Sequence, residues 1–199
     1  DLHSFPTRRS SDLVGDRENL AIVRQCFANT VLSHKTHEMA VERKSRRITI
    51  FKILNIVVIA LVLTIFVVQA MWVNNPILGY IGAGLTAAEI VLLISHLTFV
   101  TESDTTAHKN SALKYMSLRD RYKPLVADLM KGTISKDEIE RKRDELLREY
   151  QMIADLSLQT SIKDYQKAMK SLKLTEDDEN VWSDKQVDSL LPKELRLTK

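Results

Sequence analysis

The sequence predicts an all-α integral membrane protein, in which a two-helix transmembrane hairpin follows a basic N-terminal helix and precedes a cytoplasmic C-terminal helical hairpin. Three observations lead to this fold class. Two long apolar runs occupy residues 53–73 and 77–100, an Asn-Asn-Pro turn joins them, and basic residues flank the pair without entering the turn. The sequence on either side is polar and has helical periodicity.

The two apolar runs have the length of membrane-spanning helices. The first contains 21 residues without a formal charge, and the second contains 24 residues with only Glu89 and His96 as ionisable groups. At about 1.5 Å per residue, each covers roughly 30 Å, which is the thickness of a hydrocarbon core. In a soluble chain of 199 residues, too little apolar sequence would remain to cover both. We therefore expect two spans, and a soluble core hairpin is the alternative.

The turn and the basic residues predict the topology. Asn tolerates turn geometry and Pro76 suits the first position of a helix, so the second run returns antiparallel to the first. Trp72 and Tyr80 flank the turn, at a depth where aromatic rings favour the membrane interface. Because Lys and Arg lie only on the other side, we expect a multi-pass protein of the inner (cytoplasmic) membrane with both termini in the cytoplasm.

Charge and cysteine content narrow the expected partners. The net charge is +3 with a pI near 8.9, and the basic excess lies beside the apolar runs, as in Arg43, Lys44, Arg46 and Arg47. We assign this charge to topology and to anionic headgroups, so membrane lipid is an expected partner and nucleic acid is not. Cys26 is the only cysteine, which excludes an internal disulfide and a thiolate metal cluster.

Residues 1–13 have a separate origin. They read DLHSFPTRRSSDL, which is identical to the translation of a widely used short-read sequencing adapter. We interpret them as an adapter-derived artefact and leave them out of the fold. On this interpretation the natural N-terminus is absent, the two-transmembrane domain covers residues 14–172, and residues 173–199 are a polar tail.

Residues 16–47 predict a helix that runs into the first apolar run, because no Gly or Pro interrupts them. His34, His37 and Glu38 share a face of this helix and suggest metal ligation. No third ligand group of matching spacing accompanies them, and an exposed polar face explains them better. We expect no metal and no cofactor.

Four polar side chains interrupt the apolar runs. Glu89 lies at the midpoint of the second run, where a charge costs a few kcal/mol, so it must be neutral, hydrogen-bonded in a bundle or facing water. Counting from the turn places Glu89 level with residues 61–64 and His96 level with Asn55. We expect one polar surface facing a pore or an oligomer axis, and a neutral, packed Glu89 is the alternative. The members of this surface are Asn55, Thr64, Glu89 and His96.

Small residues recur four apart in the second run. This spacing predicts a smooth stripe for close helix packing in lipid, although Gly and Ala are common in membrane helices in any case. The stripe consists of Gly79, Ala83, Gly84, Ala87 and Ala88.

Cytoplasmic helices are expected at about 103–131 and 135–172. Pro124 predicts a kink or a restart in the first, and Ser135 with Glu138 has the pattern of a capping box at the start of the second. The first helix carries a coiled-coil seam with spacings of three and four, formed by Tyr115, Leu118, Tyr122, Leu125 and Leu129.

Shorter elements follow. Thr160 and Ser161 can cap a further helical segment, and residues 183–191 predict a short terminal helix that Pro192 ends. The side chains expected to face inward in the first of these are Ile162, Tyr165, Met169 and Leu172. The chain contains no glycine-rich phosphate loop, nucleophile elbow, HExxH motif or zinc-ligand quartet, so no motif supports an enzyme.

This arrangement resembles the SLATT family, the two-transmembrane effector domains that associate with SMODS nucleotidyltransferases and SLOG nucleotide sensors. The likeness covers about residues 22–172 and is carried by Ala112-x-x-Tyr115-x-x-Leu118-x-x-x-Tyr122 and Thr160-Ser161-x-x-x-Tyr165-x-x-Ala168. The resemblance implies an oligomeric pore-forming effector of a prokaryotic nucleotide-signalled conflict or antiviral defence system, which permeabilises the cell's own membrane. It implies no catalytic residues. Because the sequence contains no fused nucleotide-synthesising or nucleotide-sensing domain, we expect a stand-alone effector whose nucleotide-signalling sensor or synthase is separately encoded or was lost with the missing start.

Two other functions fit the same sequence. The chain would be a non-conducting anchor if the cytoplasmic coiled coil recruits a partner and Glu89 only packs. It would be a subunit of a proton-coupled transporter if Glu89 carries the proton.

Overall fold

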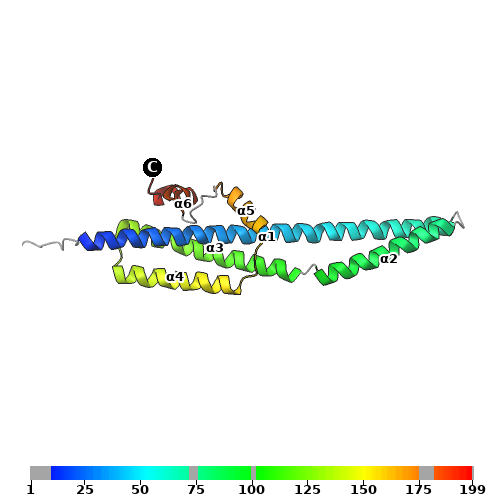
Figure 1. Cartoon of the computed structure of the whole chain (residues 1–199), viewed down its shortest axis with the longest axis horizontal. Coiled ribbons are helices and arrows are strands. Elements are labelled where there is room, and N and C mark those ends of the chain that lie inside the picture. Colours follow the sequence, from blue (N-terminus) through cyan, green and yellow to red (C-terminus); the bar gives the residue numbers. More distant parts are fainter. Residues whose placement is uncertain (1–9, 72–75, 100–101, 175–181, 199) are drawn as a thin grey trace, which may run out of the picture. The chain divides into compact units, whose positions relative to one another are not determined.

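The computed structural model describes residues 10–71, 76–99, 102–174 and 182–198, and every regular element within them is helical (Figure 1). The elements are α1 (Ser10–Met71), α2 (Pro76–Phe99), α3 (Glu102–Lys131), α4 (Lys136–Leu156), α5 (Ile162–Ser171), α6 (Asp184–Leu190) and a 3-10 turn at Lys193–Leu195. The predicted all-α class is confirmed.

The chain forms two compact units. The first comprises residues 1–40 and 107–199, and the second comprises residues 41–106. Helix α1 contributes to both units because it runs without interruption from Ser10 to Met71. The predicted continuation of the N-terminal helix into the first apolar run is therefore confirmed, and α1 begins within the adapter-like residues.

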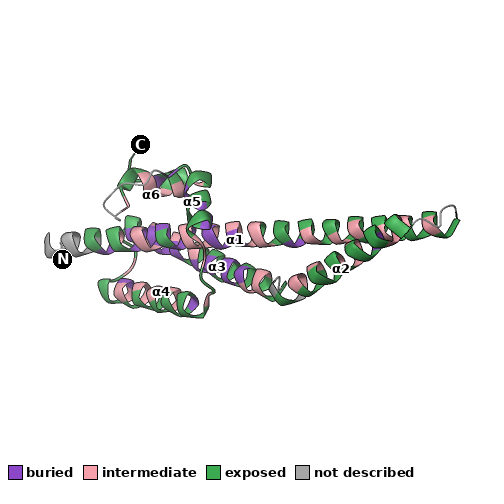
Figure 2. Ribbon diagram, turned by 45° about the vertical axis from the view of Figure 1, so that its right-hand side comes forward, coloured by how far each residue is buried: buried purple, intermediate pink, exposed green. Residues whose placement is uncertain are grey.

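The first unit is built around one hydrophobic core. Helix α1 supplies Val23, Phe27 and Val31, and α4 supplies Ile139, Leu146 and Ile153. Between them lies the α3 face formed by Tyr115, Leu118, Tyr122, Leu125 and Leu129, all of which are buried. Figures 1 and 2 place α4 and α6 on opposite sides of this part of α1, and the buried residues gather here (Figure 2).

Helix α3 passes through Pro124 without ending. It continues from Glu102 to Lys131 as one helix, so the predicted restart is wrong. Proline removes one backbone hydrogen bond and crowds the preceding turn. Tyr122 and Leu125, on either side of the proline, are both buried, and tertiary packing of this kind contributes most of the stability of a protein helix.

Helix α4 starts where the sequence predicts but not by the predicted contact. Ser135 is the N-cap residue, yet its side chain makes no capping hydrogen bond, so the predicted capping box is wrong. The Glu138 carboxylate instead pairs with Lys142 at 3.1 Å, one turn further along the helix. A lysine four residues away competes for the carboxylate that the box would need.

Helix α5 begins with a complete capping box. The Ser161 hydroxyl accepts from the Asp164 backbone N–H, and the Asp164 carboxylate accepts from the Ser161 N–H. Met169 is buried as predicted and Leu172 packs against the core, but Ile162 is 77% exposed and Tyr165 is 39% exposed, so the inward orientation predicted for these two is wrong. Ala168 and Asp164 take the buried positions instead.

The sequence after residue 172 is not merely a polar tail. Helix α6 follows the N-cap Ser183 and ends before Pro192, as predicted. Its Val187 and the following Leu191 are buried in the core of the first unit. The acidic residues 175–180, which the sequence predicts to be without structure, lie outside the described residues.

In the second unit, the last part of α1 contacts α2 in antiparallel register. The Phe51 and His96 rings lie 6.0 Å apart, and a Cβ placed on Gly82 would meet Ile65 at 3.4 Å. A Cβ on Gly79 would meet the Gln69 amide at 3.3 Å. Residue numbers therefore fall along one helix as they rise along the other.

Candidate functional site

The apolar helices of the second unit expose their side chains. Within the residues that the structure describes, two helices are long and apolar enough to cross a membrane, one ending at Met71 and one beginning at Pro76. In the most apolar stretch of the first helix no residue is buried, and in the most apolar stretch of the second helix only 6% of the residues are buried (Figure 2). The core helix of a soluble protein would have most of such a window covered. The second unit thus presents apolar surface on nearly all sides.

Two of the four predicted polar residues lie together. Asn55 and His96 line one groove between α1 and α2, of about 170 Å³, with Lys52 at the same groove. The Nε2 atom of His96 is buried and has no hydrogen-bond partner among the described residues.

Glu89 and Thr64 do not line this groove. Glu89 lies midway between Gly82 and His96, so the register places it level with Val58, midway between Ile65 and Phe51. Thr64 is six residues further along α1, roughly 9 Å away at the helical rise, and its hydroxyl bonds to the Ala60 carbonyl at 2.8 Å. The Oε2 atom of Glu89 is buried and has no partner in the part of the chain that the structure describes.

The close approach of α1 and α2 uses Gly79, which belongs to the predicted stripe, and Gly82, which does not. Gly79 and Gly82 face Gln69 and Ile65 of α1, and Gly82 is buried. Nothing lies within 4 Å of a Cβ built on Gly84. The stripe residues that remain exposed in the single chain are Ala83, Gly84, Ala87 and Ala88. The Gly79–Gly82 spacing of three marks this approach in the sequence, and a stripe based on a spacing of four does not include it.

Ion pairs within the second unit join α1 to the first residues of α3, outside the apolar runs. Lys44 pairs with Asp104 and Lys52 with Glu102, each at 2.7 Å. The hydrogen bond from Lys52 lowers the pKa of the Glu102 carboxyl. The Arg47 guanidinium lies 5.8 Å from the centre of the Phe51 ring. Two of the lysines that the sequence assigns to headgroups therefore also bind acidic side chains.

The first unit holds a buried histidine pair. The Nδ1 atoms of His37 and His108 are 3.0 Å apart, so one ring donates and the other accepts, and Tyr115 stacks on His37 at 5.6 Å. Burial, assisted by His108, lowers the pKa of His37 to about 4. The exposed polar face predicted for His37 is therefore wrong, because this side chain faces α3. No group of three ligating side chains that suits a metal ion occurs within the described ranges.

A polar pocket of about 270 Å³ adjoins the histidine pair. It lies among α1, α4 and α5, and Ser33 and Tyr150 share a hydrogen bond of 3.1 Å beside it. Its lining is rich in hydroxyl and amide groups and consists of Asn29, Leu32, Ser33, Thr36, His37, Tyr150, Thr160 and Tyr165.

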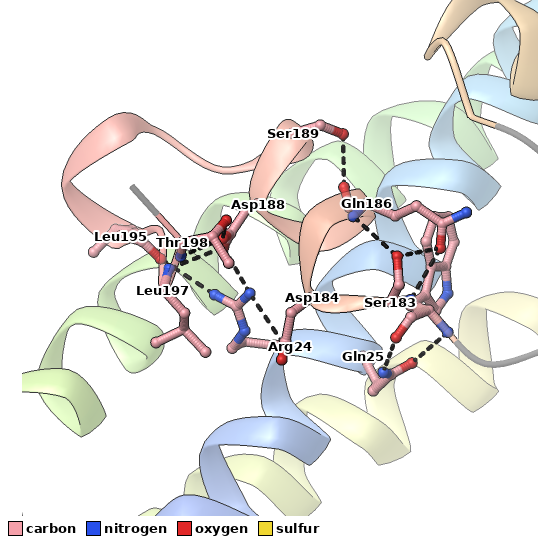
Figure 3. A network of polar contacts seen from close by, with 11 residues as sticks. Arg24, Gln25, Ser183, Asp184, Gln186, Asp188, Ser189, Leu195, Leu197 and Thr198 are labelled. Carbon is pink, nitrogen blue, oxygen red and sulfur yellow. Dashed lines mark hydrogen bonds and ion pairs between the residues drawn. The ribbon is translucent and has the colours of Figure 1, made fainter.

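The C-terminal segment is fastened to α1 by a buried ion pair (Figure 3). Arg24 donates to Asp188 Oδ1 at 2.7 Å and to the Leu195 carbonyl at 3.3 Å. Burial alone would raise the pKa of Asp188, but the hydrogen bonds from Thr198, Arg24 and Leu197 outweigh burial and lower it to about 2. No sequence pattern pairs residues so far apart, which is why this contact was not predicted.

A known protein family matches most of the chain. The SMODS and SLOG-associating 2TM effector domain family 4 (SLATT_4) matches residues 20–185, which include most of both units. The chain belongs to this SLATT family. No curated protein and no solved structure gives a significant match.

The family match agrees with the resemblance seen in the sequence and extends it. The SLATT match begins at Leu20, after the adapter-like residues, and reaches into α6, beyond the boundary predicted at residue 172. It therefore includes both Gln25 and Trp182, whose hydrogen bonds join α1 to the segment before α6. The family description assigns two transmembrane segments to an effector domain, in keeping with the two exposed apolar helices.

Proposed function

We propose that this SLATT protein is a membrane effector that permeabilises the cell's own membrane. Residues 53–73 and 77–100 cross the inner membrane as an antiparallel hairpin, and both termini lie in the cytoplasm. The helices of the first unit receive the signal. The biological setting is a prokaryotic nucleotide-signalled conflict or antiviral defence system, as the family name suggests.

One observation carries the proposal. The two longest apolar segments are almost entirely uncovered in the folded chain. At roughly 25 cal/mol per Å² of apolar surface, exposing two such helices to water costs far more than the net stability of a domain. Lipid removes this cost, and helices satisfy their backbone hydrogen bonds internally, as a membrane requires.

Conduction requires several copies. Two helices cannot enclose water, so the pore is a homo-oligomer. The exposed small residues Ala83, Gly84, Ala87 and Ala88 suit close contact between neighbouring copies. Glu89 lies seven residues after Gly82, on the face toward α1, and its buried, unpartnered oxygen would gain a partner or water if assembly opened that contact.

The signal comes from a separately encoded sensor or synthase. The first unit is the one with a packed core and a polar pocket. We assign partner recognition to that unit.

A non-conducting anchor is the second candidate. It is favoured by the separation of Thr64 from Glu89 and by the internal hydrogen bond of Thr64, because a continuous polar lining would bring such groups together. In that case the hairpin only retains the first unit at the membrane.

The test is induced expression of the full chain in cells loaded with a membrane-potential dye, together with the neighbouring signalling gene. The proposal predicts loss of potential and arrested growth. The matched control replaces residues 53–100 with an unrelated two-span hairpin, which should abolish depolarisation if the native hairpin conducts. If the swapped chain retains full function, the protein is an anchor, and if neither chain alters potential or growth, the effector proposal fails.

A further inference from the structure

The groove beside His96 is lined by apolar side chains and, at one end, by charged and polar side chains. Its apolar lining comes from both helices of the second unit and consists of Phe51, Leu54, Leu92 and Leu93. Lys52, Asn55 and His96 complete the lining. Such a groove suits a molecule with a hydrocarbon part and a polar part.

The polar part of the ligand must satisfy specific groups. His96 Nε2 is buried and has no partner among the residues that the structure describes, although an unmade hydrogen bond of a buried polar atom costs about 1–3 kcal/mol. Asn55 offers an amide on the same groove, and the Lys52 ammonium has three donors, of which Glu102 uses one. Free donors of this kind suit phosphate oxygens.

The charges around this end favour an anion. Lys52 and Lys44 each bind one acid, Glu102 and Asp104 respectively. The nearby Arg46 and Arg47 are exposed and add two positive charges. Glu102 is the acid closest to Lys52 and therefore competes with any bound phosphate for its ammonium.

The order of the groups follows that of a lipid in a leaflet. Lys52 is the last charged residue before the apolar run of α1, and Leu54 and Asn55 follow it inward. A phospholipid likewise places its phosphate at the interface and its acyl chains below. Basic residues at helix ends recognise anionic headgroups in this way.

We infer that this groove is a binding site for one anionic phospholipid, whose acyl chain lies along Leu54, Leu92 and Leu93 and whose phosphate accepts from Lys52 and His96. The inference rests on the proposed membrane insertion, but not on conduction. Bound lipid fills the space between α1 and α2 and replaces part of the Lys52–Glu102 pair.

The test measures lipid retention by native mass spectrometry on the full chain in mild detergent, titrated with phosphatidylglycerol or with phosphatidylcholine. Wild type should retain one phosphatidylglycerol in preference to phosphatidylcholine. Lys52→Gln should weaken this retention on the order of tenfold, because one charge-assisted hydrogen bond is lost. Glu102→Gln should strengthen it, because the competing acid is removed.

Lys44→Gln is the matched control. It removes the same charge and a 2.7 Å ion pair of the same unit, but Lys44 does not line the groove. It should therefore reduce the retention of phosphatidylglycerol much less than Lys52→Gln does. Equal weakening by Lys44→Gln and Lys52→Gln, or equal binding of the two lipids, would overturn the site.

Two tryptophan substitutions, one inside the groove and one outside it, provide a second test that does not depend on charge. Leu93→Trp should expel the lipid, whereas Leu63→Trp, at a position that is 59% exposed and outside the groove lining, should retain it. If a second copy of the chain covers the groove in the wild-type protein and excludes lipid, the proposal is also wrong. A chain that requires detergent but binds no phosphatidylglycerol refutes only the lipid site, whereas a chain that needs no detergent refutes membrane insertion.

Discussion

The guanidinium of Arg24 and the carboxylate of Asp188 form a buried ion pair of 2.7 Å across 164 residues of sequence (Figure 3). Asp188 also accepts from the backbone of Leu197 and Thr198, so the last residues of the chain fold over α1. Trp182 adds a bond from its indole N–H to Asn29 at 2.6 Å. The C-terminal segment is thus an integral part of the first unit.

Removal of the Asp188 carboxylate should destabilise the first unit. Asp188→Ala leaves the Arg24 charge buried without its partner, and breaking a buried pair in this way costs about 3–5 kcal/mol. Asp184 is the control, because it lies 3.6 Å from the same guanidinium but is 70% exposed, so Asp184→Ala should cost less than about 1 kcal/mol. Denaturant unfolding of the full chain in a Trp72→Phe background, followed by Trp182 fluorescence, measures both values. Equal losses would show that the buried pair has no special role.

Acid should destabilise the first unit through His37. Its pKa falls from 6.5 to about 4 because of burial and the neighbouring His108 and His34, while Asp164 acts in the opposite direction. Since the folded-state pKa lies below the unfolded-state value, the unfolded chain binds the proton first as the pH falls. The contribution of neutral His37 is complete above about pH 6.5 and is lost between pH 6.5 and about 4.

The midpoint of thermal unfolding, measured across that pH range, tests this prediction. His37→Asn retains a hydrogen-bonding group opposite His108 but has no proton to gain, so its midpoint should depend less on pH. An unchanged pH slope in this variant would assign the acid sensitivity to other groups.

Bulk at Gly82 should separate α1 from α2. A Cβ there already meets Ile65 at 3.4 Å, so Gly82→Leu forces the helices apart and should cost about 1–3 kcal/mol. Gly84→Leu is the matched control for the single chain, because a Cβ there meets nothing within 4 Å. Thermal unfolding in detergent compares the two. If Gly84→Leu instead reduces the oligomeric mass while leaving the unfolding midpoint unchanged, the exposed small residues lie between copies.

Glu89 should govern conductance if the hairpin forms a pore. Glu89→Gln retains hydrogen bonding but removes the ability to carry a charge, whereas Glu89→Leu removes both. We expect altered ion selectivity in the first and a loss of conductance of at least about tenfold in the second, equivalent to about 1.4 kcal/mol. Ion flux from liposomes that contain each variant provides the measurement. Wild-type flux in both variants would exclude Glu89 from the mechanism.

Periodic patterns made much of the fold predictable. Helix α6 starts after Ser183 and ends before Pro192 as the sequence indicates, because cap residues and proline act on their immediate neighbours. The face from Tyr115 to Leu129 is buried because its spacing places it on one side of α3. Such features depend on a few consecutive residues.

Contacts between distant residues were beyond prediction from sequence. The Arg24–Asp188 and His37–His108 pairs join segments that no local rule relates. The capping box at Ser135 fails because Lys142 takes the Glu138 carboxylate, and the restart at Pro124 fails because buried neighbours hold α3 together. For the candidate site, Asn55 and His96 line the same groove, but the register differs by about four residues from the one counted from the turn, so His96 lies level with Phe51 and Glu89 level with Val58.

The central claim is that the two apolar segments cross the membrane with both flanks in the cytoplasm, and the accessibility of single cysteines tests it most directly. In a Cys26→Ser background, Asn75→Cys probes the predicted turn and Lys185→Cys probes the C-terminal segment. A membrane-impermeant maleimide is added to intact spheroplasts and then to lysed ones. We predict labelling at position 75 in intact spheroplasts and at position 185 only after lysis. Labelling at position 185 before lysis, or recovery of the chain in the soluble fraction, would contradict the account.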